Sequence, residues 1–292
     1  MDENKLKKLL MHHNNIEIKD INNLNEKILK FKSDRPESIH IISDFDKTLT
    51  KVCVNGVKHK STYAYLRDEN YFDSAYSKKS HELHDKYYPL EISMNISQEE
   101  KIKAMEEWWT LHWKLMQESG INKNAILDVI KKKLVYEREG MFDFLEQLNK
   151  KSIPLLIFSA GIGNIIEEFL KSKNKYHKNI HIIANFFKFD IQGNSIGYTH
   201  PMIHVFNKNE VSIKNSSHFK NINNRKNVIL LGDSLGDLGM SKGIDHEKII
   251  KIGFLNDQIE ESLKEYKSKF DIVIKNDGSM IFVNELLNLL LN

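Results

Sequence analysis

The sequence predicts an α/β protein with a Rossmann-like, three-layer core built on a mostly parallel sheet. Short apolar runs rich in β-branched residues alternate with segments of helical periodicity. Several of these runs end directly in acidic or hydroxyl residues, as strands do at the ligand-binding edge of an α/β sheet. A long helical segment separates the first run from the second. We interpret that segment as an insertion into the core.

Six segments have the length and composition of buried strands. Helical patterns separate most of them, as in Met141–Lys150, where apolar residues share one face. Such alternation favours a parallel sheet that is covered on both faces. The stretch Phe187–Tyr198, with Gly193 and Asn194 inside it, predicts a hairpin. The predicted strands are Ile39–Ser43, Ile153–Phe158, His181–Phe186, Val228–Leu231, Ile249–Gly253 and Asp271–Ile274.

The segments on either side of the first predicted strand have helical patterns. After that strand we predict helices over Thr62–Tyr87, Gln98–Glu118 and Asn122–Arg138, and Ser97 begins a capping box for the second of them. We therefore expect a core of residues 1–50 and 139–292 and an all-helical insertion of residues 51–138. Two further helices are predicted within residues 1–34 from the spacing of Leu6, Leu9, Leu10, Ile18, Ile21, Leu24 and Ile28.

Composition excludes several classes of protein. A chain of 292 residues can bury a sizeable core. The net charge of +3 indicates no general nucleic-acid-binding surface, and no apolar run has the length of a membrane span. The single cysteine, Cys53, excludes an internal disulfide, and residues 1–30 lack the apolar centre of a secretory signal. We expect a cytoplasmic protein, a monomer or weak oligomer, that binds neither nucleic acid nor a membrane.

The first predicted strand runs into two aspartates. Asp44 and Asp46 follow it, and Lys47, Thr48 and Thr50 come next. This order suits a nucleophilic carboxylate and a separate acid/base group at the carboxyl edge of an α/β sheet. Taken alone, the motif is also explained by a strand that ends in an acidic turn with a capping threonine.

Three more clusters follow along the chain. Ser159-Ala160-Gly161 comes between a predicted strand and an amphipathic helix, so its hydroxyl and backbone N–H groups are available to an anion. Lys208 comes later, and a further strand leads into Gly232, Asp233 and Asp237. Separately, these clusters are explained as a helix start, a surface lysine and a turn. In this order they predict one shared site for an anion and a metal.

These four clusters resemble the four motifs of the haloacid dehalogenase superfamily of phosphotransferases. Within it, the chain resembles the type III cytosolic 5′-nucleotidases, which act on pyrimidine and 7-methylguanosine nucleotides. The likeness extends from about Ile39 to the C-terminus. The longer and more specific strings that carry it are Tyr88–Glu91, Phe158–Gly163, Ile203–Lys208 and Lys251–Asp257.

The resemblance implies a Mg²⁺-dependent enzyme that hydrolyses nucleoside 5′-monophosphates to nucleoside and phosphate. It implies that Asp44 forms an aspartyl-phosphate and that Asp46 protonates the leaving nucleoside. The expected Mg²⁺ ligands are the carboxylates of Asp44 and Asp233 and the main-chain carbonyl of Asp46. Asp237 is expected to orient these ligands or to hold Lys208.

The resemblance also implies a set of phosphate contacts. Lys208 offers a compact positive charge to the phosphate and the nucleophile together. The hydroxyl of Ser159 and the N–H of Ala160 are expected to hold phosphate oxygens. Thr48 is expected to belong to the same set of residues around the phosphate. The alternative is that it only caps the turn.

The insertion resembles the cap that closes over the active site and supplies specificity in this superfamily. Glu91 matches the glutamate that recognises the base in the family; without that context it would be an exposed residue at a helix end. Trp108 and Trp109 are consecutive, so we expect one in the core and Trp109 stacked on the base. His112 stands where relatives carry a serine that contacts the nucleotide, and we expect it at the substrate.

We expect the pyrimidine nucleotides CMP and UMP as substrates, with 7-methylguanosine monophosphate as a further one. A phospho-receiver module also combines acidic residues, a threonine and a lysine around Mg²⁺, but it is much shorter and carries its aspartate after a middle strand. A catalytically inactive nucleotide-binding protein is disfavoured because every expected catalytic residue is present. A related phosphatase that acts on sugar phosphates is opposed only by residues of the insertion. A nucleoside phosphotransferase of different substrate preference is a further alternative.

Overall fold

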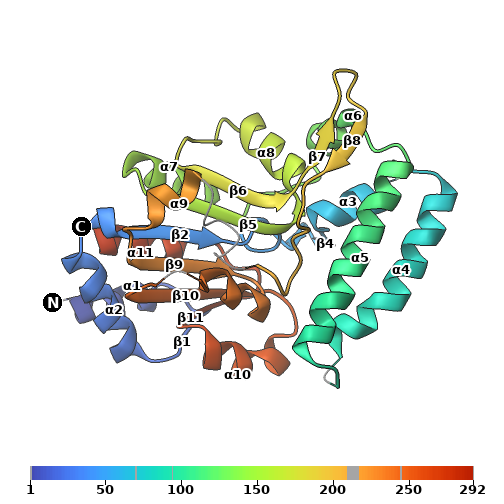
Figure 1. Cartoon of the computed structure of the whole chain (residues 1–292). Coiled ribbons are helices and arrows are strands. Elements are labelled where there is room, and N and C mark those ends of the chain that lie inside the picture. Colours follow the sequence, from blue (N-terminus) through green and yellow to red (C-terminus); the bar gives the residue numbers. More distant parts are fainter. Residues whose placement is uncertain (1, 70, 94, 209–216, 244, 292) are drawn as a thin grey trace.

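The computed structural model describes residues 2–69, 71–93, 95–208, 217–243 and 245–291. Its centre is a seven-stranded sheet with the order β1-β11-β10-β9-β2-β5-β6 (Figure 1). All neighbouring strands in it are parallel except β1 and β11, so the predicted sheet is confirmed. The strands are β1 (Ile16–Ile18), β2 (Ile39–Ser43), β5 (Leu155–Ile162), β6 (Ile180–Asn185), β9 (Asn227–Gly232), β10 (Lys248–Leu255) and β11 (Ile272–Lys275).

Successive residues of the central strands face two separate hydrophobic layers. In β2, Ile41 packs into one layer and Ile42 into the other, because neighbouring strand side chains point to opposite faces. The three-layer core predicted from the sequence is therefore confirmed. The first layer contains α1 (Asp2–Met11), α2 (Ile21–Ser33), α7 (Met141–Lys150), α8 (Gly163–Ser172) and α11 (Ile281–Leu291), and the second contains α9 (Ser217–Ile222) and α10 (Ile259–Lys269).

A short strand separates the two predicted N-terminal helices. Ile16 and Ile18 belong to β1, which pairs antiparallel with β11, so the prediction of Ile18 as helical was wrong. Both isoleucines pack against the first hydrophobic layer. Glu17, between them, forms ion pairs with Lys267 and Lys275. The segment therefore has the two-residue periodicity of a strand, although its partner strand lies near the other end of the chain.

The insertion is mainly helical, and its longest helix has the predicted bounds. Helix α5 (Gln98–Glu118) begins with a capping box at Ser97, as the sequence predicted. The helix predicted over Thr62–Tyr87 is instead two helices, α3 (Thr62–Asp68) and α4 (Ser74–Ile92). The second begins afresh because Asp73 caps its N-terminus.

The remaining parts of the insertion differ from the prediction. Helix α6 (Lys123–Lys131) ends before Arg138, so its predicted C-terminal half is not helical. A small hairpin of β3 (Cys53–Val54) and β4 (Val57–Lys58) precedes α3, so the insertion is not entirely helical. Both differences fall in short segments with weak periodicity.

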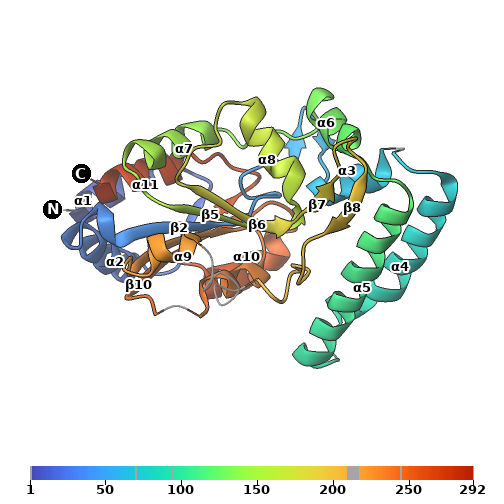
Figure 2. The same ribbon diagram turned by 45° about the horizontal axis from the view of Figure 1, so that its top comes forward.

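Helices α4 and α5 stand side by side, away from the sheet and at the end of the molecule opposite the two termini (Figure 2). The predicted hairpin is present as β7 (Phe187–Phe189) and β8 (Ser195–Tyr198). Its Phe187 ring stacks on Trp113 of α5, with 4.2 Å between the ring centroids. The hairpin thus joins the core to the insertion. No helix among the described residues is long and apolar enough to cross a membrane.

The two connections between the insertion and the core lie next to each other. A short antiparallel pairing joins the residues that leave the core to the residues that return to it. This pairing closes the insertion at its base. It consists of the Thr50–Glu137 bridge, a hydrogen bond from Lys51 N–H to the Tyr136 carbonyl at 3.0 Å and one from Arg138 N–H to the Leu49 carbonyl at 2.9 Å.

Candidate active site

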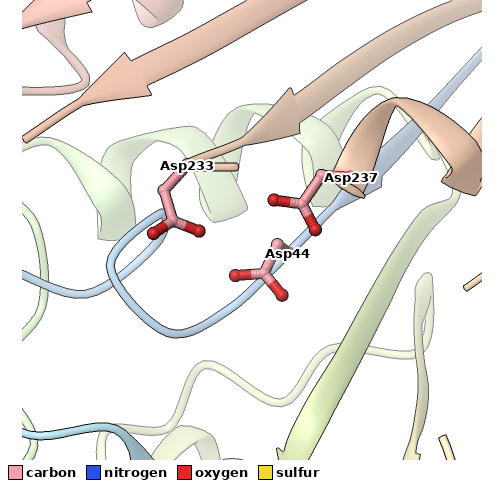
Figure 3. Close-up of side chains that lie close together, drawn as sticks. All are labelled: Asp44, Asp233 and Asp237. Atoms are coloured by element: carbon pink, nitrogen blue, oxygen red, sulfur yellow. The ribbon is translucent and has the colours of Figure 1, made fainter. Parts of the chain in front are cut away.

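Three carboxylates meet where β2 and β9 end. The two strands are parallel neighbours in register, so the residues that follow them reach the same edge of the sheet. Asp44 follows β2, Asp233 follows β9, and Asp237 lies in the short 3-10 helix η3 (Leu235–Ser241). One carboxylate oxygen of each lies within 4.8 Å of the others, and the side chains point toward one another (Figure 3).

A buried lysine neutralises part of this negative charge. The Nζ atom of Lys208 donates to Asp44 and, at 3.0 Å, to Asp237. The other oxygen of Asp237 accepts from the N–H and the hydroxyl of Ser234, at 3.0 and 2.8 Å. Although burial lowers it, the charges of Asp237 and Asp44 raise the pKa of Lys208 above its ordinary value. Lys208 is therefore a fixed cation beside the Asp44 carboxylate.

Burial and crowding change the proton affinity of the carboxylates. Burial raises the pKa of Asp44 well above its usual value; Lys208 opposes this rise, and the neighbouring carboxylates add to it. Burial and the charge of Asp237 raise the pKa of Asp233 to about 7. A further cation would stabilise the ionised forms of Asp44 and Asp233. The donor set therefore fits a divalent metal ion that prefers oxygen ligands.

Asp46 is held by the first residue of helix α3. The N–H and the hydroxyl of Thr62 donate to its two carboxylate oxygens. Burial raises the pKa of Asp46, while the bonds from Thr62 oppose the rise. A raised pKa favours the protonated carboxyl, which a general acid needs. Gly161 of β5 permits this arrangement, because a Cβ there would come within 2.2 Å of the Thr62 hydroxyl and 2.7 Å of Asp46.

Ser159 and Ala160 lie at the same edge of the sheet, inside a strand that is longer than predicted. Strand β5 continues to Ile162, and the Ser159 hydroxyl accepts from the N–H of Gly161 at 3.0 Å. Both Ser159 and Ala160 line the cavity described below. Thr48 does not line it; its side chain is fully buried, and no described residue forms a hydrogen bond with its hydroxyl.

Arg138 fixes the loop that follows β2. Its buried guanidinium donates to the backbone carbonyls of Lys47, Thr48 and Thr50. It also forms an ion pair with Asp277, with 3.0 Å between Nη1 and Oδ1. The three carbonyls point inward and need donors, because unpaired buried backbone groups are costly. Arg138 supplies these donors from the returning end of the insertion.

A cavity of about 330 Å³ extends from the carboxylates to the insertion. This volume is at the lower end of the range for small-molecule sites. The core lines one end of the cavity with Asp44, Asp46, Lys208 and Asp233, so this end is strongly polar. The residues that the insertion contributes to the lining are Ser61, Tyr63, Arg67, His84, Glu91, Met105, Trp108 and Trp109.

Glu91 and both consecutive tryptophans reach the cavity. Glu91 lies in the last turn of α4, and burial raises its pKa. Trp108 and Trp109 are both half-buried, with ring centroids 6.2 Å apart and planes inclined by 21°. The expectation that one of these two lies in the core was therefore wrong. The fully buried tryptophan of α5 is Trp113.

His112 lies behind the wall of the cavity and does not line it. It is buried, with its Nε2 atom 2.9 Å from the hydroxyl of Tyr76. Its ring packs edge-on against Tyr63, with 4.9 Å between centroids. Burial lowers the pKa of His112 to about 3, so the ring is neutral near pH 7. The structure thus makes His112 a support for Tyr63 and gives it none of the expected access to substrate.

The sequence did not predict a role in the site for several residues, among them Thr62, Tyr63, Arg67 and Arg138. The Ser-Thr pair at the start of α3 marks a helix N-terminus, yet nothing in the sequence links it to Asp46. Tyr63 and Arg67 have the one-turn spacing that brings two side chains to one face of a helix, which is the only signal that could have found them. Arg138 has no local signal.

The fold and this site define the class of the protein. An acidic cluster after parallel strands, a lysine that contacts it and a helical insertion after β2 are the arrangement of haloacid dehalogenase-like phosphatases. A HAD family hydrolase from Salmonella enterica shares this fold, with a TM-score of 0.57 and 15% identity over 93% of this chain and 79% of that chain. This likeness concerns the fold, and it agrees with the predicted three-layer core.

More similar proteins identify the family. The model for pyrimidine 5′-nucleotidase (UMPH-1) matches residues 47–291. The 7-methylguanosine phosphate-specific 5′-nucleotidase A of Xenopus laevis is 38% identical over 273 residues, which are 93% of this chain and 94% of that protein. The crystal structure of cytosolic 5′-nucleotidase IIIB bound to cytidine has a TM-score of 0.85 and 31% identity, covering 95% of this chain and 94% of that one. The chain belongs to the pyrimidine 5′-nucleotidase family and is a phosphoric monoester hydrolase.

Proposed function

We propose that this enzyme hydrolyses pyrimidine nucleoside 5′-monophosphates, CMP above all and UMP, with Mg²⁺ as its cofactor and 7-methylguanosine monophosphate as a further substrate. The observation that carries the proposal is one continuous cavity from the Asp44–Lys208 contact to Glu91. Relatives named for 7-methylguanosine phosphate and a neighbour that binds cytidine support it. That neighbour is a cytosolic enzyme, which supports a cytoplasmic location.

Two proposed steps divide the hydrolysis. In the first, a carboxylate oxygen of Asp44 attacks the phosphorus, and the bond between phosphorus and the 5′-oxygen breaks. Asp46 gives its proton to that oxygen, and the nucleoside leaves. In the second, a water molecule attacks the phosphorus of the aspartyl-phosphate and loses a proton to Asp46. The bond to Asp44 breaks, phosphate leaves, and both carboxyl groups return to their starting states.

Charge neutralisation is the main demand of this chemistry, because a carboxylate must approach a phosphate dianion. Mg²⁺ would supply part of it, held by the Asp44 and Asp233 carboxylates and the Asp46 main-chain carbonyl. Lys208 supplies a second positive charge next to Asp44 and is itself held by Asp237. The Ser159 hydroxyl and the Ala160 N–H are proposed to hold the remaining phosphate oxygens.

The insertion is proposed to recognise the base. Glu91 can accept hydrogen bonds from the amino group of cytosine, or from the N1–H and amino group of 7-methylguanine. Trp109 offers a ring face for stacking, and a cationic base such as 7-methylguanine gains an additional attraction to it. Adenine presents its amino group elsewhere and carries no charge, so AMP should be a poor substrate.

Phosphate release from a panel of substrates tests the proposal. The panel contains CMP, UMP, 7-methylguanosine monophosphate, AMP, ribose 5-phosphate and p-nitrophenyl phosphate, each with Mg²⁺. We expect CMP, UMP and 7-methylguanosine monophosphate to exceed AMP and ribose 5-phosphate in kcat/KM by about tenfold or more. A preference for AMP would overturn the assignment of the base, and a preference for ribose 5-phosphate would replace the nucleotidase with a sugar phosphatase.

A further inference from the structure

Arg67 brings a permanent positive charge to the end of the cavity that the insertion forms. The proposed reaction gives this residue no role. In the proposed reaction, Lys208, which contacts Asp44, already supplies the positive charge of a side chain at the phosphate. A half-buried arginine that lines a ligand cavity needs a partner on the ligand or a structural reason for its position.

The position of Arg67 along α3 separates it from the reacting atoms. Thr62, the first residue of α3, is fixed at Asp46 by two hydrogen bonds. Arg67 comes five residues later, and a helix rises 1.5 Å per residue, so its backbone is about 7–8 Å farther along the helix axis. Because Arg67 lines the same cavity as Asp44, we expect it to face the nucleoside part of a substrate whose phosphate is bound at Asp44.

The guanidinium of Arg67 is oriented by its neighbours. Its Nε and Nη2 atoms donate to the two carboxylate oxygens of Asp68. Its Cζ atom lies 5.8 Å from the centre of the Tyr63 ring, one turn earlier on the same helix. Tyr63 in turn packs edge-on against Trp109, with 5.0 Å between centroids. A guanidinium has five N–H donors in a rigid fork, so pairing with Asp68 leaves donors for a ligand.

We propose that Arg67 is a specificity-determining residue that donates a hydrogen bond to a carbonyl oxygen of the base. This inference rests on the proposed nucleotidase function and deepens it. Glu91 on α4 offers only acceptors, whereas Arg67 on α3 offers only donors, and both line the same cavity. Cytosine and uracil carry a carbonyl at position 2, and 7-methylguanine carries one at position 6. Adenine carries none, so it leaves the arginine without a partner.

Steady-state kinetics of Arg67→Met test the proposal, because methionine keeps much of the aliphatic packing and removes the donors. We expect KM for CMP to rise about tenfold or more with kcat changed less than about threefold, and kcat/KM for p-nitrophenyl phosphate to stay within about twofold. Lys60→Met is the matched control. It removes another cation that pairs with Asp68, at 3.4 Å, but one that does not line the cavity, so it should leave both substrates unaffected.

A modified nucleotide separates the two base contacts. The 5′-monophosphate of pyrimidin-2-one ribonucleoside keeps the carbonyl of CMP but lacks its amino group. With this substrate the penalty of Arg67→Met should persist, whereas the penalty of Glu91→Gln should disappear. If Arg67→Met does not fold, judged by its melting temperature, Arg67→Lys removes the fork and keeps the charge; its KM for CMP should also rise.

Three results would overturn the proposal. One is an unchanged KM for CMP in Arg67→Met, and a second is an equal loss on CMP and p-nitrophenyl phosphate. The third is a loss confined to nucleoside 3′,5′-bisphosphates, which would assign Arg67 to a second phosphate. Failure of the nucleotidase function has a different signature, in which the wild-type enzyme hydrolyses p-nitrophenyl phosphate but no nucleoside monophosphate.

Discussion

Thr62 uses both of its hydrogen-bond donors on the carboxylate of Asp46, the N–H at 2.9 Å and the hydroxyl at 2.8 Å. The Thr62 hydroxyl also accepts from the N–H of Ile162 in β5, at 3.1 Å. The insertion, the loop after β2 and the neighbouring strand are therefore joined at one carboxyl group. This group is oriented by a residue of the insertion and not by its own loop.

Removing the Thr62 hydroxyl should slow the reaction with little effect on binding. In Thr62→Val the backbone bond to Asp46 remains and the side-chain bond is lost, so we expect kcat for CMP to fall about tenfold to a hundredfold at nearly constant KM. Steady-state kinetics check this. Thr62→Ser keeps the hydroxyl and should retain most of the activity. Equal rates for the valine and serine variants would show that the backbone bond alone orients Asp46.

The two aspartates after β2 should fail in different ways when changed to asparagine. Asp44→Asn should abolish turnover and leave the fold intact, because an amide cannot form the covalent intermediate. Asp46→Asn should retain some phosphorylation but release product slowly, because proton transfer is impaired in both steps. Rapid acid quenching with a labelled phosphate measures the intermediate, and circular dichroism checks the fold. More than a small residual rate in Asp44→Asn would exclude the covalent mechanism.

Removal of divalent metal should abolish activity. The three carboxylates at the sheet edge repel one another and a phosphate unless a cation intervenes. We expect activity to vanish with an excess of chelator and to return with Mg²⁺. Ca²⁺ should inhibit, because its larger and looser coordination shell misplaces the nucleophile. An enzyme fully active in excess chelator would contradict the assignment of the acidic cluster as a metal site.

Glu91 should contribute to recognition of the nucleobase and not to the chemical step. Losing a hydrogen bond in a closed pocket costs roughly 1–3 kcal/mol, so Glu91→Ala should reduce kcat/KM for CMP about tenfold to a hundredfold. Hydrolysis of p-nitrophenyl phosphate, which has no base, should hardly change. Equal losses on both substrates would move Glu91 from substrate recognition to structural support.

The same residue should give the reaction a pH signature. Burial raises the pKa of Glu91, so its carboxylate is protonated at a higher pH than an ordinary glutamate is. Only the ionised form is a pure acceptor, so the advantage of the wild type over Glu91→Gln in kcat/KM for CMP should shrink as the pH falls through that raised pKa. The ratio of the two enzymes removes the titration of the phosphate and of Asp46. A ratio independent of pH down to the ordinary glutamate range would contradict this role.

Arg138 should matter both for stability and for rate. Arg138→Lys cannot reach all of the carbonyls that the guanidinium holds, and we expect a loss of about 3 kcal/mol in the free energy of unfolding. We also expect a reduced kcat, because the loop after β2 carries Asp44 and Asp46, the proposed nucleophile and acid. Arg225→Lys is the control. Arg225 also donates to backbone carbonyls, those of Pro36 and Ile39, but these lie at the start of β2, away from Asp44 at its end. It should lower stability without lowering kcat.

The central strands and their terminal residues could be predicted because each carries its own local signal. Strand β2 has its predicted bounds, since a short run with three isoleucines ends at Asp44. The acidic cluster followed from the same signal, because parallel strands bring their ends together without further information. Helix α5 had a capping box and a long amphipathic pattern, so its bounds were also predictable.

Features that depend on distant partners could not be predicted. Strand β1 has three residues and exists only because β11, more than two hundred residues later, pairs with it. The contacts of Arg138 join the two ends of the insertion, and no local pattern marks them. The consecutive tryptophans 108 and 109 both reach the cavity, because a cavity between helices is wider than the single face that helical spacing describes.

The pairing of Thr50 with Glu137 closes the insertion at its base. The segment between these two residues therefore leaves the core and returns to it at the same point. A replacement of different length that begins and ends at this bridge leaves the register of the sheet strands unchanged, but it must again supply the two donors that Thr62 gives to Asp46. The loop after β2 and Arg138 stay on the core side of the bridge. We therefore expect that the residues that the insertion contributes to the cavity can be exchanged between relatives as one contiguous stretch of sequence.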